Sequence, residues 1–458
     1  MLRALNRFGL GARPGERDRI RDPRGWLRAQ LDGGAPVLHA PEPASPGAIG
    51  DAVRGLRMPE QASADQRRLA RRQLVALGAA EVRAGLTARV TSERPFVERL
   101  VAFWSNHLCV STGAKILVAP LAGSYERDVI RPHVLGRFED MVLASARHPA
   151  MLVYLDNFQS IGPGSRAAAR VGQRAAGARR GLNENYAREL MELHTLGVNG
   201  VYTQQDVQEL ARILTGWTIE GVGRPGARAG QRNIPAGSPI GFVFHELQHE
   251  PGSKTVLGRS YQEAGVAEGE GAIRALCRHP STATFVATKL VAHFVSDDPP
   301  AAAVERVARA FASSGGDLKV VARALVDEPE AWREDARKFR TPQDWFVAVL
   351  RALGVSEVSA SAAPVLRQLR HPFWSPPSPK GFGDALQEWG DADSLLNRAE
   401  LARTIASLPG SRLVDPRSLV DVVDVAAGNP LHDLLANASI PAGDRVALAI
   451  AGPAFQWR

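Results

Sequence analysis

The sequence has 458 residues, too many for one ordinary hydrophobic core, which predicts two or three domains or one large helical body with insertions. Its hydrophobic content of 45% is typical of a globular protein, and it has no run of about 18 apolar residues, so no membrane-spanning helix is expected. The net charge of +8 comes mainly from arginines spread along the chain rather than clustered with aromatic residues, so a nucleic-acid partner is not expected.

The cysteines and the first residues bear on the compartment. Only Cys109 and Cys277 occur, which is too few for a disulfide framework or a cysteine-based zinc site. We expect two free, buried thiols, with a single bridge as the alternative. The segment from Met1 to Gly15 has no apolar stretch of the kind found in secretion signals, so a cytoplasmic location is expected. A periplasmic or exported location stays open if a signal was removed.

Helical signals dominate the first part of the chain. Between residues 92 and 108, apolar side chains recur at the spacing of a helix face, with Ser92 as the expected cap and Pro95 in the first turn. Further helices are predicted over 17–32, 64–90, 118–131 and 137–147. Residues 158–182 are rich in Gly, Ala, Ser and Arg and predict a mobile basic loop.

The next two helices have clear end signals. The helix predicted at 183–196 should end at Gly197, because glycine adopts the left-handed backbone of a C-cap at little cost. A second helix, at 203–216, should begin with a capping box formed by Thr203 and Asp206.

The remaining sequence predicts a mainly α fold, a large multi-helix, bundle-like body with a short β-hairpin insertion and long basic loops. The hairpin is expected within 219–260, where Gly and Pro are frequent. Residues 354–380 resemble a linker, and helices are predicted over 281–295, 301–314, 317–327, 341–353, 395–407, 417–426, 429–436 and 442–452. We expect three segments, namely an N-terminal helical segment at 1–90, a central core at 91–353 and a C-terminal helical segment at 354–458 packed on that core.

The helix predicted at 183–196 concentrates ionisable groups on one side. At 100° per residue, the polar side holds Glu184, Arg188, Glu189 and Glu192, and the opposite side holds Tyr186, Leu190 and Leu193. His194 falls outside the polar side and is expected to cap the C-terminal end of the helix as a cation.

Two interpretations of the clustered carboxylates are open. In the first, Glu189 and Glu192 bind a divalent metal ion together with histidines from other segments, first of all His107 and His249. In the second, the carboxylates belong to a structural network and are neutralised by Arg188 and Arg212.

A second group of candidates lies between residues 245 and 254. His245-Glu-Leu-Gln-His249 matches the H-E-x-x-H pattern of zinc proteases, which requires a helix. Pro251 disfavours helix at Glu250, so a strand end followed by a loop is the preferred interpretation. The adjoining His249-Glu-Pro-Gly-Ser-Lys254 either lines a site or forms a polar hairpin tip.

Two further histidine segments are candidates. His107 follows a tryptophan near a helix end and is either a ligand or acid–base group, or a half-buried structural residue. His279 opens the helix at 281–295, which carries Lys289 and His293 four residues apart. A helix start can bind an anion, but an ordinary capped helix is preferred here.

Several segments together carry a family resemblance. They are Leu5-Asn-Arg-Phe-Gly-Leu-Gly-Ala-Arg-Pro-Gly15, Phe103-Trp-Ser-Asn-His107, Asn183 to Gly197, Tyr202 to Trp217, His249 to Gly258, His279 to Pro300, Pro379-Lys-Gly-Phe382 and Ala451-Gly-Pro-Ala-Phe-Gln456. With these segments the chain resembles, over nearly its whole length, the bacterial domain of unknown function numbered 1800. The resemblance implies no reaction, because that family's activity is not established.

The resemblance does imply which residues recur in the family's motifs. These are Trp104, His107, Asn183, Glu184, Arg188, Glu189, Glu192, His194, Arg212, His249, Lys254, His279 and Lys289. His245 is not part of the pattern, which weakens the zinc-protease interpretation further. The sequence departs from the family at Phe382, where tryptophan is usual, and at Glu250, where aspartate is common.

We therefore predict an enzyme with a carboxylate and histidine site on the 183–196 helix, acting by metal-assisted hydrolysis or redox chemistry on an unknown substrate. The candidate catalytic residues are Glu184, Arg188, Glu189, Glu192, His107 and Lys254, and the candidate metal ligands are Glu189, Glu192, His107 and His249. The alternative is a non-catalytic helical scaffold or binding protein with a buried Glu/Arg network, whose basic loops at 158–182 and 222–234 meet an acidic partner, a polysaccharide or a membrane surface.

Overall fold

Capping residues supplied by the sequence define several helix ends in the computed structural model. Ser63 Oγ accepts a hydrogen bond from Gln66 N at the start of α3, and the Gln66 side chain accepts one from Ser63 N. Thr203 and Asp206 form the same reciprocal pair at α11, which confirms the predicted capping box. The structure describes residues 1–39, 44–55, 63–172, 182–198, 200–220, 235–408, 414–423, 425 and 428–458.

The described chain is mainly helical, as predicted. The first helices are α1 (Pro23–Asp32), α2 (Pro46–Gly55), α3 (Ala64–Thr91), α4 (Pro95–His107), α5 (Ala122–Tyr125), α6 (Arg131–His133), α7 (Phe138–Arg147), α8 (Pro149–Tyr154), α9 (Arg166–Gly172), α10 (Asn185–Glu189) and α11 (Gln204–Ile213). They are followed by α12 (Val266–Cys277), α13 (Pro280–Phe294), α14 (Ala301–Ser313), α15 (Leu318–Asp327), α16 (Pro342–Ala352), α17 (Ala362–Gln368), α18 (Leu386–Trp389), α19 (Ala392–Ala406), α20 (Pro430–Ala436) and α21 (Ala442–Ala451). Short 3₁₀ turns connect several of them.

Two predicted helices in the first half have different bounds. The helix expected over 92–108 begins at Pro95, because a residue without an N–H suits the first helical position. Ser92 ends α3 instead of capping α4. The helix expected over 118–131 is broken into short turns, and its Glu126–Ile130 part is π-helical.

Two further helices are shorter than predicted. The helix expected over 17–32 is continuous only from Pro23, since the Asp22 side chain caps that position by accepting a hydrogen bond from the backbone. The helix expected over 183–196 is α-helical at α10 and π-helical at Leu190–Thr195. Gly197 follows with φ +89°, as expected of a glycine C-cap.

The predicted hairpin region contains two short antiparallel pairs rather than one. The strands are β1 (Trp217–Ile219) paired with β2 (Phe242–Phe244), and β3 (Lys254–Val256) paired with β4 (Arg259–Tyr261). Leu257 and Gly258 join β3 to β4, with φ values of 50° and 73°. Positive φ at both central residues is the requirement of a two-residue hairpin turn whose twist matches its strands.

Segments predicted as loops also contain helices. Within 158–182 the structure has α9, and within 354–380 it has α17. Residues 173–181 of the first basic loop and the whole of the second, 222–234, lie outside the described residues.

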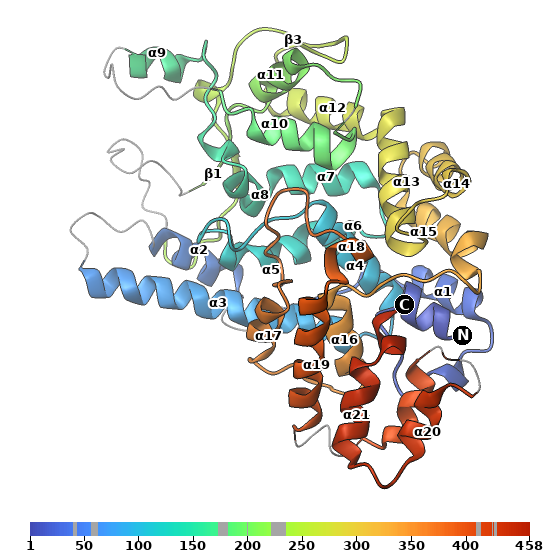
Figure 1. Ribbon diagram of the computed structural model, residues 1–458. Coiled ribbons are helices and arrows are strands. Elements are labelled where there is room, and N and C mark those ends of the chain that lie inside the picture. The colour runs from blue at the N-terminus through green and yellow to red at the C-terminus, as the bar shows by residue number, and fades with distance from the viewer. Residues whose placement is uncertain are drawn as a thin grey trace.

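One continuous core of buried apolar side chains extends from Leu2 to Phe455 and draws on all three predicted segments. In Figure 1, α7, α10, α11 and α12 occupy one end of the molecule, α19 to α21 occupy the other, and α4 lies between them. The division into three segments stays a prediction. Among the described residues, no helix is both long and apolar enough to cross a membrane.

The two ends of the chain meet. Arg7 donates hydrogen bonds to the carbonyl oxygens of Ala336 and Arg458, at 2.6 and 3.2 Å. The backbone N–H of Arg458 donates to Lys338 O at 2.8 Å, and Figure 1 shows the two termini close together. This junction adjoins α13 through Arg7, which donates to Val295 O at 2.6 Å.

An irregular segment, residues 374–384, crosses the C-terminal end of α4, and we call it the strap. Thr112 N donates to Trp374 O at 2.9 Å. The Asn106 amide donates to Phe382 O and accepts from Phe382 N, both at 2.8 Å. Gly381 has φ +85°, and a Cβ there would lie 2.5 Å from Asn106 O, so this contact requires glycine.

Candidate functional site

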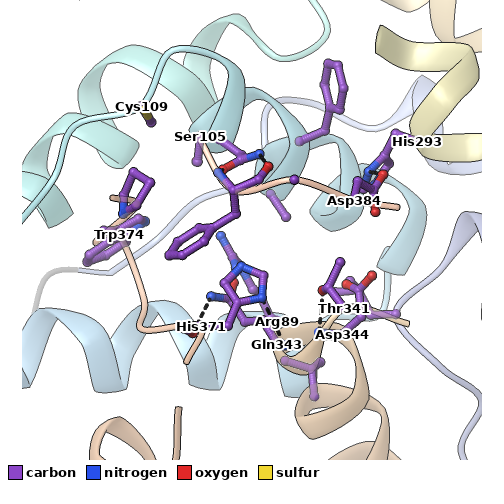
Figure 2. Close-up of a pocket in the computed structure, with 18 of the residues that line it drawn as sticks. Arg89, Ser105, Cys109, His293, Thr341, Gln343, Asp344, His371, Trp374 and Asp384 are labelled. Carbon is purple, nitrogen blue, oxygen red and sulfur yellow. Dashed lines mark hydrogen bonds and ion pairs between the residues drawn. The ribbon is translucent and has the colours of Figure 1, made fainter. Parts of the chain in front are cut away.

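A small cavity of about 80 Å³ lies between α4, α16 and the strap. Its walls combine apolar side chains such as Phe103 and Val347 with polar groups that Figure 2 shows around it. The polar groups are Arg89, Ser105, Asn106, His293, Thr341, Gln343, Asp344, His371 and Asp384. A space of this size holds a few water molecules or the reacting part of a small substrate.

His293 and Asp384 form a hydrogen-bonded pair at one side of the cavity (Figure 2). His293 lies near the end of α13 and donates from Nδ1 to Asp384 Oδ2 of the strap at 2.6 Å. Their side chains are 15% and 23% exposed, so protein surrounds the pair without sealing it from solvent. The hydrogen bond fixes the imidazole tautomer and leaves Nε2 as a proton acceptor.

Two arginines tie this pair to a second carboxylate. Arg458 donates to Asp384 Oδ1 at 3.2 Å, and its Nε lies 3.4 Å from Asp344 Oδ2. Arg99 donates to Asp344 Oδ2 at 3.1 Å and lies 3.5 Å from His293 Nε2. Each carboxylate therefore has a guanidinium neighbour. The His293 imidazole lies between Asp384, at its Nδ1, and Arg99, at its Nε2.

These contacts set the protonation states. Burial would raise the pKa of Asp384, but His293 and Arg458 outweigh it and bring the pKa to about 2. Burial acts in the same sense on Asp344, yet Arg99 and Arg458 hold its pKa well below the usual range. Burial lowers the pKa of His293 to about 4, although Asp384 opposes that shift. At neutral pH the pair is a neutral imidazole held by an ionised carboxylate.

The opposite wall of the cavity is already satisfied by its own contacts. Arg89 donates to Gln343, and its guanidinium lies 4.3 Å from the centre of the Phe373 ring. The His371 ring stacks on Trp389 at 4.9 Å, and burial lowers its pKa to about 3. These groups shape the cavity, whereas His293 carries an unprotonated nitrogen, Nε2, whose hydrogen-bond neighbour is Arg99 Nη1.

A buried network of carboxylates and arginines adjoins the cavity. Glu126 Oε2 accepts from Ser105 Oγ at 3.1 Å and from Trp374 Nε1 at 2.9 Å. Arg131 donates to Glu126 Oε1 at 2.7 Å and to both oxygens of Glu98. This network is not the one that the alternative interpretation expected on the 183–196 helix, because it links α4 to the π-helical turn after α5.

The carboxylate helix carries a half-exposed ion-pair cluster. Arg188 lies 3.4 Å from Glu184 Oε2 and 3.3 Å from Glu192 Oε1, which confirms the predicted grouping of these three. Glu189 is half-buried and, within the described part of the chain, has no hydrogen-bond or ion-pair partner. Burial and Glu192 raise its pKa. Arg212 pairs with Glu209 instead of the helix carboxylates.

The π-helical turn at Leu190–Thr195 moves the later side chains of this helix, because its hydrogen bonds span five residues rather than four. His194 is buried, and burial together with Lys289 lowers its pKa to about 3, so its predicted role as a cationic cap is wrong. His107 Nε2 donates to His194 O at 3.1 Å. Among the described residues, His107 Nδ1 and His194 Nε2 have no hydrogen-bond partner.

His249 and Lys254 point inward and share one carboxylate. Glu268 Oε2 lies 3.0 Å from His249 Nε2, and Glu268 Oε1 lies 3.1 Å from Lys254 Nζ. All three side chains are buried, so they attach the loop to α12 rather than forming an exposed polar tip. His245 is exposed and precedes a short 3₁₀ turn at Glu246–Gln248, which agrees with the strand end and loop preferred over a zinc-protease helix.

The predicted metal ligands do not come together. The four are Glu189, Glu192, His107 and His249. Across the residues that the structure describes, no group of three or more His, Cys, Asp and Glu side chains is arranged to hold a metal ion. The divalent metal therefore stays a prediction, while the prediction of free, buried thiols at Cys109 and Cys277 is confirmed.

The start of α13 is an ordinary capped helix, as preferred for this segment, because His279 Nδ1 accepts a hydrogen bond from Ser281 N at 3.2 Å.

Sequence patterns missed most of the cavity. The spacing of Lys289 and His293 on α13 was the available signal for a site. Asp384 had no signal beyond its position after the Pro379-Lys-Gly-Phe382 motif.

We expect acid to destabilise the protein well above the pH at which carboxylates titrate. Burial lowers the pKa of five histidines, namely His107, His148, His194, His293 and His371. Between pH 6.5 and 4 these histidines bind protons in the unfolded chain but stay neutral in the folded chain. The free energy of unfolding therefore falls as pH falls, by up to roughly 1.4 kcal/mol per pH unit for each histidine. Glu81 and Glu189, whose pKa values burial raises, act in the opposite sense.

Urea unfolding at pH 7, 6 and 5 measures this effect. The midpoint should fall steadily while the slope with urea stays constant. An unfolding free energy that is level from pH 7 to pH 5 would contradict the assignment of neutral buried histidines.

A family model described as "Protein of unknown function (DUF1800)" matches residues 3–457. No curated protein and no solved structure matches the chain.

Proposed function

The chain belongs to the DUF1800 family, and we propose that it is an enzyme in which His293, held by Asp384, takes a proton from a small polar substrate in the cavity. The observation that carries the proposal is the 2.6 Å hydrogen bond from His293 Nδ1 to a carboxylate at the cavity wall. A histidine oriented in this way is the most frequent general base in enzymes.

The neighbours of His293 support a proton-transfer role. Its Nε2 is the unprotonated nitrogen of the neutral imidazole, with Arg99 Nη1 as its hydrogen-bond neighbour, and Asp384 stabilises the imidazolium that forms when Nε2 takes a proton. Arg99, 3.5 Å from Nε2, carries a positive charge that favours return of the proton after the chemical step. His293 then acts first as the base that takes the proton and afterwards as the acid that returns it.

The proton comes from substrate or water rather than from a protein nucleophile. The Ser105 hydroxyl donates to Glu126, and the Thr341 hydroxyl accepts from Asp344 N. No hydroxyl or thiol among the described residues forms a hydrogen bond with His293. The reaction class that fits is removal of a proton from carbon or from an activated water, without an acyl-enzyme.

A turnover screen tests the proposal. Purified protein is incubated at pH 7.5 with small oxo acids, hydroxy acids, esters and amides, and products are followed by NMR. We expect turnover of one class, reduced about 10²–10⁴-fold in His293→Gln. His245→Gln, which changes an exposed histidine outside the cavity lining, should keep wild-type turnover. Absence of turnover, or full turnover in His293→Gln, would favour the non-catalytic scaffold.

Metal-assisted chemistry on the carboxylate helix is the second candidate, and Glu189 favours it because this half-buried carboxylate has no partner among the described residues. The same screen separates the two. Turnover that a chelator and Glu189→Ala abolish, while His293→Gln leaves it intact, would move the reaction to this helix.

A further inference from the structure

Lys289 differs from most lysines of the chain in having no partner among the described residues. It lies on α13, one turn before His293, and its side chain is only partly exposed. Within the described residues its ammonium has no hydrogen-bond or ion-pair partner. Four other lysines are paired with carboxylates, namely Lys115 with Asp156, Lys254 with Glu268, Lys319 with Asp32 and Lys338 with Asp297.

The groups around Lys289 supply no negative charge. Its Nζ lies 5.6 Å from the centre of the Phe285 ring, which is 6.1 Å from the His107 ring. Burial raises the pKa of Cys109 to about 12, which keeps the thiol neutral. His107 and His194 are likewise neutral, because burial lowers both pKa values. A cation with little solvent exposure and no counter-charge is unfavourable, so this environment favours the neutral amine.

A second lysine, on the strap, also acts on Lys289. Lys380 is exposed and also lacks an ion-pair partner among the described residues. Burial lowers the pKa of Lys289 to about 8; Cys109 opposes this shift, and Lys380 adds a smaller lowering. Burial combined with a neighbouring cation is a recognised way to activate a lysine as a nucleophile.

We propose that Lys289 is the amine that forms an imine with the carbonyl carbon of a small oxo acid, and that Lys380 pairs with the carboxylate of that acid. The amine nitrogen bonds to the carbonyl carbon, and the carbonyl oxygen leaves as water with the two hydrogens of the neutral amine. A C=N bond replaces the C=O bond, and no oxidant or reductant is needed.

This inference deepens the proposed function and rests on it for the second step. Residues four apart on a helix have Cβ atoms about 5–6 Å apart, so His293 lies on the same face as Lys289. Cys109 and His293 both line the cavity that Figure 2 shows, and Lys289 lies one helical turn before His293. A protonated imine on Lys289 acidifies the adjacent carbon, and His293 Nε2 is the base that takes its proton.

Reductive trapping tests the imine. The protein is incubated at pH 7.5 with pyruvate and cyanoborohydride, and the adduct is located by peptide mass mapping over the six lysines and the N-terminal amine. We expect Lys289 to be labelled at least about 10-fold faster than Lys319, which is paired with Asp32, because a pKa near 8 leaves much of the Lys289 amine unprotonated at pH 7.5. Lys289→Arg and Lys289→Met should both remove this adduct, and Lys319→Arg should keep it.

Three further comparisons decide the proposal. Labelling of Lys289 should have a pH midpoint near 8, and Lys380→Met should slow trapping of pyruvate more than trapping of acetone, which lacks the carboxylate. The inference would be overturned if the labelling rates of all lysines simply followed their solvent exposure, or if labelling of Lys289 had a pH midpoint above 10. In His293→Gln the adduct should still form while turnover is lost. If the adduct forms but no turnover depends on His293, the proposed function is refuted while the imine on Lys289 is supported.

Discussion

Replacing Glu126 with alanine is expected to lower the free energy of unfolding by about 3–5 kcal/mol. Glu126 is 1% exposed, and its two oxygens accept hydrogen bonds from the side chains of Arg131, Ser105 and Trp374. Arg89 Nη2 lies 3.4 Å from the same carboxylate. Alanine would leave these buried donors with fewer partners or none, and an unpaired buried charge is among the costliest changes in a protein interior.

Urea denaturation of Glu126→Ala measures the loss. Asp65→Ala is the matched control, since it removes a carboxylate from an exposed pair with Arg68 that contributes little to stability. Glu126→Gln keeps the shape and should fall between wild type and alanine. Equal stability of the Glu126 and Asp65 alanine variants would show that the buried network does not stabilise the fold.

Replacing Asp384 with asparagine is expected to lower turnover about 10²–10⁴-fold while leaving the fold intact. The neutral amide cannot stabilise a protonated His293, and its NH₂ group can donate to Nδ1, which would place the imidazole proton on Nε2. Asp384 acts through His293, so it is a positioning residue. Its loss should also lower the pKa of His293 further, because the negative charge that opposes burial is gone.

Three measurements separate this role from a structural one. Nitrogen NMR of labelled histidine reports the tautomer of His293, the pH profile of turnover reports its pKa, and thermal unfolding reports the fold. Asp297→Asn is the matched control, because Asp297 pairs with Lys338 next to Asp384 but has no contact with His293. A wild-type tautomer and pH profile in Asp384→Asn would contradict the positioning role.

Local signals predicted the helices well and the site poorly. The capping box at Thr203 and the glycine at Gly197 act through neighbours in sequence, so their structures follow from the residues alone. The π-helical turn at Leu190–Thr195 does not, because it depends on packing of His194 and its neighbours into the core. The angular count nevertheless grouped Glu192 with Arg188, whereas the cationic cap predicted at His194 was wrong.

The cavity was hidden from sequence reasoning for a related reason. Its polar wall joins His293, Asp344 and Asp384 from three separate segments, and their partner Arg458 comes from a fourth. No spacing rule connects such residues, since only the tertiary fold brings them together. By contrast, the acidic helix drew attention because its charges are adjacent in sequence, and three of them prove to be a half-exposed ion-pair cluster.

The junction of the chain ends has a consequence for synthesis. Arg458 completes the charge balance of Asp344 and Asp384, and its backbone pairs with Lys338, so the cavity cannot take its final form until this residue has left the ribosome. Contacts between Arg7 and Arg458 join positions 451 residues apart. Such distant contacts form late and slowly, so until then Arg7 lacks its hydrogen bond to Arg458 O, and this period is when the nascent chain most needs protection from aggregation.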